Sequence, residues 1–467
     1  MQTRREMIRT TTMLAGGIAA GGLLVPSALG AAGPAAALRP ARRSANGKLQ
    51  LLQVGVGGSI APADRDQLKA HPDVTFTGFC DVDSNELDAV RKDFPDAFTC
   101  RDFREAFDRH AGKFDGVVVC TPDHNHALVM MTALKAGKHV YGQKPLVQQL
   151  SEVKAILDAV KACPQLVTQT GNQRMGYEGR QRAVDILKRG LLGKAIEAHV
   201  WVNGPNEGVD YFFWYGGLKD PITPPENVDW TLWQGAAQDA PCRPGLIGRQ
   251  WRSSWDYGTG QLGDWCTHLL DVLYFAYDLP APASVLSQTM KASDFYHALC
   301  VHSTLTYPVA GPLFAKPWFP VHYCDRGQAP SRAALGIPAG TFPNTGTLVV
   351  CEDGILLVEP EGKIEVWRGG KPVDPKTIPG QGEVKERNHW HSWVDRIVGK
   401  KDAFVQTPFE YGARLAEAGV LCSRAARFPN VELLWDRGKC AFTNHEEATK
   451  TVVRREYRKG FELPTFA

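Results

Sequence analysis

Short apolar runs alternate with stretches of helical periodicity between residues 48 and 172. The runs long enough for buried strands occupy 48–54, 74–80, 115–120, 139–141 and 166–170. Between them lie stretches that predict helices at 62–70, 87–94, 103–110, 127–136 and 151–162, with Ser151 placed to cap the last one. Strands that alternate with helices in this way indicate a doubly wound α/β domain with a parallel sheet, which we assign to residues 49–172.

The pattern changes after Gly171. A helix at 180–189 and an alternating strand at 196–202 precede a stretch, 203–258, that is rich in aromatic residues and has little periodicity. Further on, strands are predicted near 283–288, 299–307, 346–352 and 355–358, and helices at 389–398 and 410–426. We therefore expect residues 173–467 to form a second α/β domain with a predominantly antiparallel open sheet and helices on one face.

The stretch 258–271 is the strongest candidate for chemistry in this second domain. Asp264 and His268 are four residues apart, so on a helix both side chains leave the same face, while Leu262, Leu269 and Leu270 anchor the helix in a core. A carboxylate beside an imidazole suits proton transfer or metal binding. The alternative is a helix cap with a hydrogen-bonded core histidine.

A glycine-rich turn follows the first predicted strand. Gly55, Gly57 and Gly58 allow the backbone to approach a pyrophosphate at a helix N-terminus. Asp81, at the end of the second strand and 24 residues after Gly57, is placed to bind the adenosine ribose and to repel a 2′-phosphate, which favours NAD over NADP. The third glycine position of the fingerprint holds Ile60, which predicts a wider or re-routed turn.

Polar residues follow the later strands of the first domain, where the ligand loops of an open parallel sheet lie. They form the segments Thr121-Pro122-Asp123-His124-Asn125-His126, Gln143-Lys144-Pro145 and Gly171-Asn172-Gln173. The aromatic residues of 203–258, Trp255 among them, either stack on sugar rings or pack their loops onto the domain.

The N-terminus predicts export. The net charge of +3 comes from the basic start, without which the chain is slightly acidic, and there Arg4 and Arg5 precede an apolar, Gly/Ala-rich run. We assign residues 1–32 to a twin-arginine-type signal peptide, with a general secretory signal as the alternative, and 33–48 to a disordered linker. The apolar run is too short for stable membrane insertion. We expect a periplasmic protein that the twin-arginine machinery exports already folded.

Composition excludes other classes of partner and site. The chain has no basic stripe of the kind that binds nucleic acid. Its eleven cysteines show no zinc-ligand spacing, and their odd number argues against a disulfide framework. We therefore expect no bound metal, although His124, His126, Asp264 and His268 together leave a metal-assisted lyase as a minor option.

These motifs, in this order, resemble the Gfo/Idh/MocA oxidoreductase family, and most of all its exported twin-arginine branch, some members of which resemble glycoside hydrolase family 109. The resemblance implies an N-terminal Rossmann domain, a C-terminal α/β domain, bound NAD and a sugar or cyclitol substrate. It also implies a homo-oligomer that pairs through the open sheet face. One departure is Gln143, which replaces the glutamate of the family's Glu-Lys-Pro motif and loses its charge.

The resemblance also assigns residue roles. His268 takes a hydroxyl proton, and Lys144 and Asp264 orient the hydroxyl and tune the histidine. The expected cofactor contacts are Gly55, Gly57, Gly58, Asp81, Thr121, Pro122, His126 and Lys144, and the expected substrate contacts are His124, Asn172, Gln173 and Trp255.

Three functions remain open on the sequence. The first is an NAD-dependent oxidoreductase of a sugar or cyclitol hydroxyl whose cofactor is tightly held, because the periplasm has no free NAD pool. The second is an NAD-dependent glycosidase or glycoside lyase that forms a transient 3-keto intermediate. The third is a non-catalytic sugar-binding protein on a degenerate Rossmann frame, for which Ile60 and Gln143 are the motive.

Overall fold

The computed structural model describes residues 47–202, 218–289, 293–298, 300–326 and 329–466. The predicted signal peptide, almost all of the linker, and Tyr211, Phe212, Phe213 and Trp214 lie outside the described residues. Within the described part, no helix combines the length and the apolar character that a membrane crossing requires.

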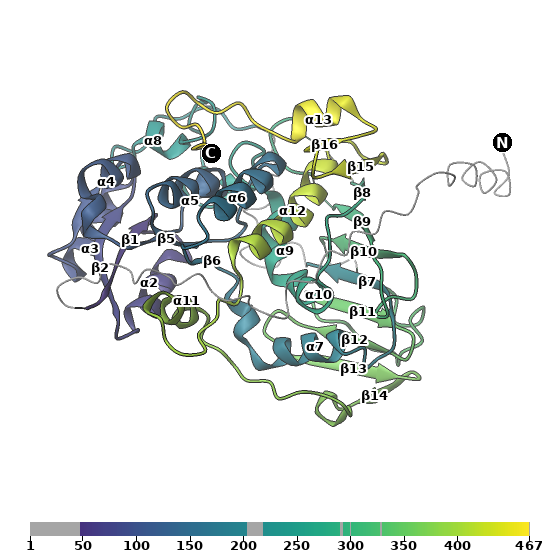
Figure 1. The fold of residues 1–467 in the computed structure, drawn as a ribbon. Coiled ribbons are helices and arrows are strands. Elements are labelled where there is room, and N and C mark those ends of the chain that lie inside the picture. The colour runs from purple at the N-terminus through teal and green to yellow at the C-terminus, as the bar shows by residue number, and fades with distance from the viewer. Residues whose placement is uncertain (1–46, 203–217, 290–292, 299, 327–328, 467) are drawn as a thin grey trace. The chain divides into compact units, whose positions relative to one another are not determined.

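The first sheet is the predicted parallel sheet, with strands in the order β3-β2-β1-β4-β5-β6. Figure 1 labels β1, β2, β5 and β6 of this sheet. Its strands are β1 (Leu49–Val54), β2 (Val74–Cys80), β3 (Phe98–Cys100), β4 (Gly116–Val119), β5 (His139–Gly142) and β6 (Thr168–Thr170). Its helices are α2 (Ala61–Lys69), α3 (Ser84–Asp93), α4 (Phe103–His110), α5 (His126–Lys135) and α6 (Leu150–Ala162). The doubly wound Rossmann architecture is confirmed.

The predicted cap of α6 is wrong by two residues. The N-cap is Gln149, and Ser151 is already the second helical residue. Glu152 reaches back to accept hydrogen bonds from the backbone N–H groups of Gln149 (2.9 Å) and Gln148 (2.8 Å). The glutamate thus satisfies donors that a helix start leaves without partners, so a serine cap is not needed.

The second sheet has ten strands in the order β14-β13-β12-β11-β7-β10-β9-β8-β15-β16. All of its pairs are antiparallel except β7 with β10, which confirms the predicted sheet type. The strands are β7 (Ala195–Trp201), β8 (Ser284–Gln288), β9 (His302–Pro308), β10 (Trp318–Cys324), β11 (Gly346–Cys351), β12 (Gly354–Val358), β13 (Ile364–Arg368), β14 (Lys371–Val373), β15 (Glu432–Asp436) and β16 (Ala441–Phe442).

Helices cover this sheet and link it to the first one. They are α7 (Glu178–Lys188), α8 (Trp230–Gln234), α9 (Gly260–Leu269), α10 (Asp271–Tyr277), α11 (His389–Val398), α12 (Phe409–Ala425) and α13 (Glu446–Val452). Helix α12 packs against both α6 and α9, so one continuous core joins the two sheets. Helix α11 returns to the Rossmann half, where Trp393 is fully buried against Leu51 and Val118. Sequence position therefore does not separate the two halves cleanly, and the boundary at residue 172 stays a prediction.

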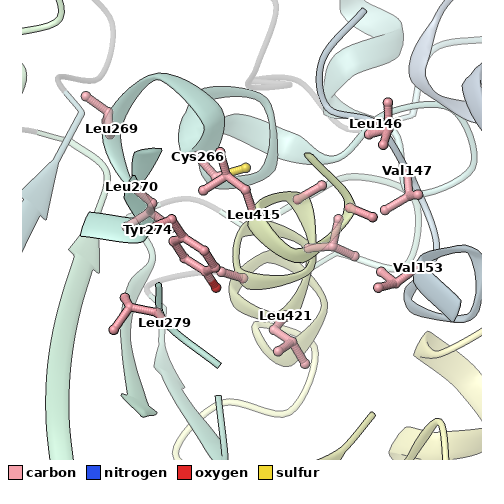
Figure 2. Close-up of a cluster of buried hydrophobic side chains, with 14 of the residues drawn as sticks. Leu146, Val147, Val153, Cys266, Leu269, Leu270, Tyr274, Leu279, Leu415 and Leu421 are labelled. Atoms are coloured by element: carbon pink, nitrogen blue, oxygen red, sulfur yellow. The ribbon is translucent and has the colours of Figure 1, made fainter. Parts of the chain in front are cut away.

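Helix α9 is the helix predicted within 258–271, and its apolar face is built into the core. Leu262, Leu269 and Leu270 are at most 2% exposed. Figure 2 shows Cys266, Leu269 and Leu270 among the apolar side chains around Leu415 of α12. This packing fixes the rotation of α9, and with it the direction in which the polar face points.

Candidate active site

A cavity of about 770 Å³ extends from the glycine-rich turn after β1 to the polar face of α9. Residues of both halves of the chain line it, as is common for ligand sites between two layers. Gly55 has a φ of +83°, and a Cβ atom there would lie 2.6 Å from the carbonyl carbon of Cys120. Only glycine fits this turn, which brings the backbone to the cavity.

Acidic side chains line the end of the cavity near this turn. Asp81 accepts hydrogen bonds from the backbone N–H groups of Val56 (2.7 Å) and Asp83 (3.0 Å). Asp83 and Glu86 also line this end. Burial raises the pKa of Asp81, and burial together with the charges of Asp81 and Asp83 raises the pKa of Glu86. The three carboxyl groups make this end unfavourable for an additional phosphate.

The structure shows how Ile60 is accommodated. Ile60 is the N-cap of α2, and its side chain lines the cavity. The close contact between helix and strand falls one residue later, at Ala61, which is fully buried and accepts a hydrogen bond from Gln53 Nε2 to its carbonyl oxygen (2.9 Å). Ala61 therefore provides the tight packing between helix and strand, one position after the third glycine position of the fingerprint.

At the other end of the cavity, Lys144 and Asp264 form an ion pair. Lys144 Nζ donates to Asp264 Oδ2 (3.0 Å) and to the Asp264 carbonyl oxygen (3.1 Å), and Arg252 Nε lies 3.7 Å from Asp264 Oδ1. The sequence pattern paired Asp264 with His268 because both lie on one helix face. The structure instead pairs Asp264 with cations from outside its own helix.

His268 lines the same end of the cavity and is 6% exposed. Its Nδ1 atom is buried and has no hydrogen-bond partner among the described residues. Burial, and then the positive charges of Lys144, Arg174 and Arg180, lower its pKa well below the usual value, so the ring is neutral near pH 7. A neutral imidazole has one ring nitrogen that can accept a hydrogen bond or a proton from a ligand.

Helix α9 is held beneath His268 by a buried ion pair. Arg180 of α7 and Asp271 of α10 are both fully buried and form a hydrogen-bonded pair. Arg180 Nη2 also donates to the carbonyl oxygen of His268 (2.8 Å). Since a buried charge without its partner is costly, this pair ties α7, α9 and α10 into one arrangement and fixes the backbone of His268.

Asp123 is a cavity residue that the sequence analysis quoted but gave no role. Its carboxyl group is 2% exposed and accepts a hydrogen bond from Thr259 Oγ1 (2.7 Å), the N-cap residue of α9. Burial, and then the charge of Asp264, raise the pKa of Asp123 to about 7. The site therefore holds a second carboxyl group, and this one titrates near neutral pH.

Models of protein families match both halves of the chain. Residues 49–169 match the model described as "Oxidoreductase family, NAD-binding Rossmann fold", and residues 180–307 match the one described as "Oxidoreductase family, C-terminal alpha/beta domain". Both are models of one family. The chain belongs to the Gfo/Idh/MocA oxidoreductase family.

Two curated proteins are similar to parts of the chain. The 2,7-anhydro-N-acetylneuraminate hydratase of Escherichia coli is 28% identical over 102 residues, which cover 21% of this chain and 27% of that protein. The myo-inositol 2-dehydrogenase of Thermotoga maritima is 23% identical over 162 residues, 34% of this chain and 48% of that protein. The chain thus matches between about a quarter and a half of the length of these relatives.

Solved structures share the fold over most of their length. The WlbA dehydrogenase of Bordetella pertussis, in complex with NADH and UDP-GlcNAcA, has a TM-score of 0.56 at 15% identity, over 83% of this chain and 99% of that one. An aldose–aldose oxidoreductase of Caulobacter crescentus, complexed with glycerol, has a TM-score of 0.54 at 13% identity, over 83% of this chain and 100% of that one. At this identity the likeness concerns the fold.

The cavity of this Gfo/Idh/MocA protein contains every predicted cofactor residue. They are Gly55, Gly57, Gly58, Asp81, Thr121, Pro122, His126 and Lys144. Buried polar atoms without a partner among the described residues, such as Thr121 Oγ1 and Gln173 Oε1, also belong to lining residues. An open space at Gly58, where a Cβ would meet nothing within 4 Å, adds to the fit with a large polar ligand such as a dinucleotide.

His126 contributes its ring to the wall in a fixed orientation. Its Nδ1 and Nε2 atoms each lie 2.7 Å from a carbonyl oxygen, that of Pro145 and that of Thr121. The ring therefore ties the start of α5 to the loop that carries Lys144. Burial lowers the pKa of His126 to about 4.

Three of the four predicted substrate residues lie outside the cavity lining, and only Gln173 belongs to it. His124 is 1% exposed and turns toward the carbonyl oxygens of Trp233 (3.0 Å) and Tyr257 (3.3 Å). Trp255 packs against His297 with ring centroids 3.9 Å apart. Asn172 is fully buried, with its Nδ2 atom 3.5 Å from Asp271 Oδ2. These side chains support the architecture around the site.

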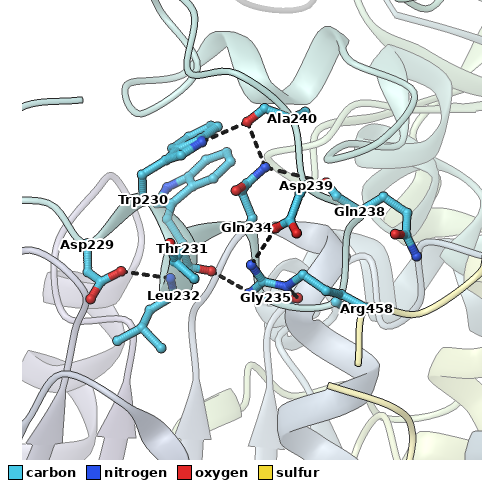
Figure 3. Close-up of polar contacts among 12 residues, drawn as sticks. Asp229, Trp230, Thr231, Leu232, Gln234, Gly235, Gln238, Asp239, Ala240 and Arg458 are labelled. Atoms are coloured by element: carbon cyan, nitrogen blue, oxygen red, sulfur yellow. Dashed lines mark hydrogen bonds and ion pairs between the residues drawn. The ribbon is translucent and has the colours of Figure 1, made fainter. Parts of the chain in front are cut away.

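The aromatic residues near α8 pack mainly on one another. Trp233, Trp251 and Tyr257 are buried in one cluster, of which Trp233 and Trp251 also reach the cavity. Arg458, near the end of the chain, holds this wall: it donates to the carbonyl oxygen of Gly235 (3.1 Å) and forms an ion pair with Asp239 (2.9 Å) (Figure 3). The closing segment of the sequence therefore clamps α8, whose residues line the cavity.

The described residues contain no group of three or more His, Cys, Asp or Glu side chains arranged to hold a metal ion. His124, one member of the metal option considered from the sequence, points away from the cavity toward Trp233 and Tyr257.

Proposed function

We propose that this protein is an NAD-dependent oxidoreductase that acts on a hydroxyl group of a carbohydrate or cyclitol with a tightly held cofactor. The observation that carries the proposal is that His268, whose lowered pKa keeps its ring neutral, lines the same end of the cavity as the Lys144–Asp264 ion pair. The names of the relatives agree with this substrate class, since one is a myo-inositol dehydrogenase and another is a dehydrogenase bound to a nucleotide sugar.

The residues fit the parts of NAD in the order in which they line the cavity. The glycine turn and the N-terminus of α2 offer backbone N–H groups and a positive dipole end to a pyrophosphate. Asp81 is placed for the adenosine ribose, and the acidic surroundings favour NAD over NADP. Lys144 and His268 then stand at the opposite end, where the redox step takes place.

When bound, the nicotinamide supplies the hydride chemistry. The protein's task is to bind the substrate hydroxyl, to orient it and to take its proton. His268 accepts that proton because burial and nearby cations keep its ring neutral before the step. Lys144, held by Asp264 at 3.0 Å, donates a hydrogen bond to the reacting oxygen and stabilises negative charge on it.

We extend the proposal to location and assembly. The paired Arg4 and Arg5 before an apolar run support export through the twin-arginine machinery to the periplasm. That route delivers folded protein with its cofactor already bound. Assembly as a homo-oligomer through the open face of the second sheet completes the proposal.

A second candidate function is redox-assisted cleavage of a glycosidic bond. The observation in its favour is Asp123, an additional carboxyl group in the cavity whose pKa lies at about 7. Elimination and water addition each need an acid or a base beyond the one that serves the hydroxyl. Cleavage of aryl glycosides or 3-keto-glycosides by the purified protein would favour this reaction over simple oxidation.

The cofactor test comes first. We expect the purified protein to carry nearly stoichiometric NAD(H), identified by mass and absorbance after denaturation. Sugars and cyclitols are then screened by the change in absorbance of the bound nicotinamide. A protein that purifies without nicotinamide and does not bind added NAD would overturn the proposal and leave the sugar-binding alternative.

Replacing Asp81 by asparagine is expected to raise the affinity for NADP relative to NAD by about tenfold, because a carboxylate repels the 2′-phosphate. The measurement is the ratio of the two dissociation constants from fluorescence titration of protein stripped of its cofactor. The matched control is Asp88→Asn, a carboxylate on α3 with 64% of its side chain exposed. An unchanged ratio in Asp81→Asn contradicts the assignment of Asp81 to the ribose.

A further inference from the structure

Gln143 stands where the related motif has a glutamate, and the carboxylate of Asp64 lies next to it. Gln143 lines the cavity immediately before Lys144, and its Oε1 atom accepts a hydrogen bond from the backbone N–H of Lys144 (3.2 Å). Its Nε2 atom donates to Asp64 Oδ2 at 2.6 Å. The amide therefore connects a carboxylate of α2 to the backbone that carries Lys144.

The amide of Gln143 has little freedom to turn. A Cβ atom at Gly171 would lie 2.6 Å from its Nε2 atom, so the backbone after β6 presses against its plane. Gln143 itself is 3% exposed. The Gln143 amide is hydrogen-bonded to Asp64 on one side and to the backbone of Lys144 on the other. The position of Asp64 therefore affects the position of Lys144.

Asp64 is fully buried, and its other hydrogen-bond donors are neutral. Trp390 Nε1 donates to Oδ1 (2.8 Å), and Cys120 Sγ donates to Oδ2 (3.4 Å). Burial raises the pKa of Asp64 to about 6, so the group is ionised at pH 8. A buried carboxylate held by neutral donors costs stability, which is a reason to expect a function for it.

We propose that Asp64 is a positioning residue that supplies, from α2, the negative charge absent at residue 143 and holds Gln143 and Lys144 at the cavity. The related motif has a glutamate carboxylate immediately before the lysine. Here the carboxylate belongs to Asp64, and Gln143 connects it to Lys144. The inference rests on the nicotinamide binding that the proposed function includes.

The charge has a consequence for the cofactor. The oxidised nicotinamide ring is positive and the reduced ring is neutral, so a fixed carboxylate behind Lys144 favours the oxidised form. In partly polar surroundings, one charge would change the ratio of the two affinities by about tenfold. A role limited to packing would change both affinities alike.

The test removes the carboxylate at residue 64 and then places one at residue 143. The affinities for NAD⁺ and NADH are measured at pH 8 without substrate. In Asp64→Asn, we expect the affinity for NAD⁺ relative to NADH to fall by about tenfold. In Asp64→Asn/Gln143→Glu, which moves the carboxylate to residue 143, the ratio is expected to return to the wild-type value. The control is Asp66→Asn, the same change at an exposed position of the same helix, where the ratio should not change.

The outcomes are distinguishable. An unchanged ratio in Asp64→Asn, or a double variant that does not restore it, overturns the inference while leaving the proposed function intact. A wild-type protein that binds neither NAD⁺ nor NADH contradicts the proposed function itself. If Asp64→Asn alone does not fold, the double variant decides: folding with the wild-type ratio supports the inference, and failure to fold or a shifted ratio contradicts it.

Discussion

Replacing His268 by alanine is expected to lower kcat by about 10²–10⁴-fold while the affinity for NAD stays within about twofold of wild type. His268 lies at the reacting end of the cavity, and its neutral ring is the candidate acceptor for a substrate proton. The cofactor contacts lie toward the glycine turn, so they survive the change. The measurement pairs single-turnover reduction of the bound cofactor with NAD titration.

The matched control is Cys266→Ala, two residues earlier on α9. Cys266 is fully buried on the opposite, core-facing side, where Figure 2 places it near Leu415. Loss of its sulfur removes packing and is expected to cost about 1 kcal/mol of stability with turnover unchanged. Wild-type turnover in His268→Ala would contradict the assignment, and an equal loss in both variants would show that disturbance of the helix, rather than loss of the imidazole, is responsible.

Much of the Rossmann half was predictable because most of its strands appear as short apolar runs, and β4, for example, is buried along its whole length. The run 74–80 predicts β2 with the bounds that the structure has, and the turn glycines follow β1 directly. The second sheet was harder. Strand β10 contains Pro320, which argues against a strand inside a sheet, yet it pairs with β7 and β9.

Within the site, the sequence predicts which segments contribute but not which side chains meet. Helical spacing placed Asp264 and His268 on one face, but it carries no information about Lys144, 120 positions away, which is the observed partner of Asp264. The same limit applies to Asp64, whose contact with Gln143 spans 79 positions. Such pairs depend on tertiary packing, that of α2 against β2 and that of α9 against α12.

The segment 123–126 shows how local geometry decides the outcome. Residues 123–125 form a 3-10 turn, in which side chains three positions apart lie on the same side. Asp123 and His126 therefore both reach the cavity, while His124 turns toward Trp233. The sequence pattern alone favoured His124 for the substrate and gave no role to Asp123, although the three-residue spacing between Asp123 and His126 was the available signal.

Asp123→Asn is expected to stabilise the protein at pH 8 and to leave its stability unchanged at pH 4. The folded protein raises the pKa of Asp123 from 3.8 to about 7, so it holds the proton more tightly than the unfolded chain does. The stability that this provides is complete below pH 3.8 and is lost as the pH rises through about 7. Asparagine keeps the shape and the acceptor for Thr259 and does not titrate.

The size of the effect follows from the shift in pKa. A difference of roughly three pKa units corresponds to an upper bound of about 4 kcal/mol, and because the charge of Asp264 contributes to the shift we expect about 1–3 kcal/mol. The measurement is the free energy of unfolding in urea at pH 4, 6 and 8, with wild type and variant in the same cofactor state. Asp256→Asn, an exposed aspartate three residues before Thr259, is the control and should show no pH-dependent difference.

A gain in stability combined with a loss of turnover would identify Asp123 as a residue retained for function at the expense of the fold. Buried carboxyl groups that destabilise a protein at neutral pH are concentrated in functional sites, because catalysis needs groups that titrate near the working pH. If the difference between Asp123→Asn and wild type is the same at pH 4 and pH 8, folding does not raise the pKa of Asp123, and the group is ionised in the folded protein at neutral pH. Its charge would then be balanced by Lys144 and Arg252, and the acid–base role offered for the second candidate function would fall.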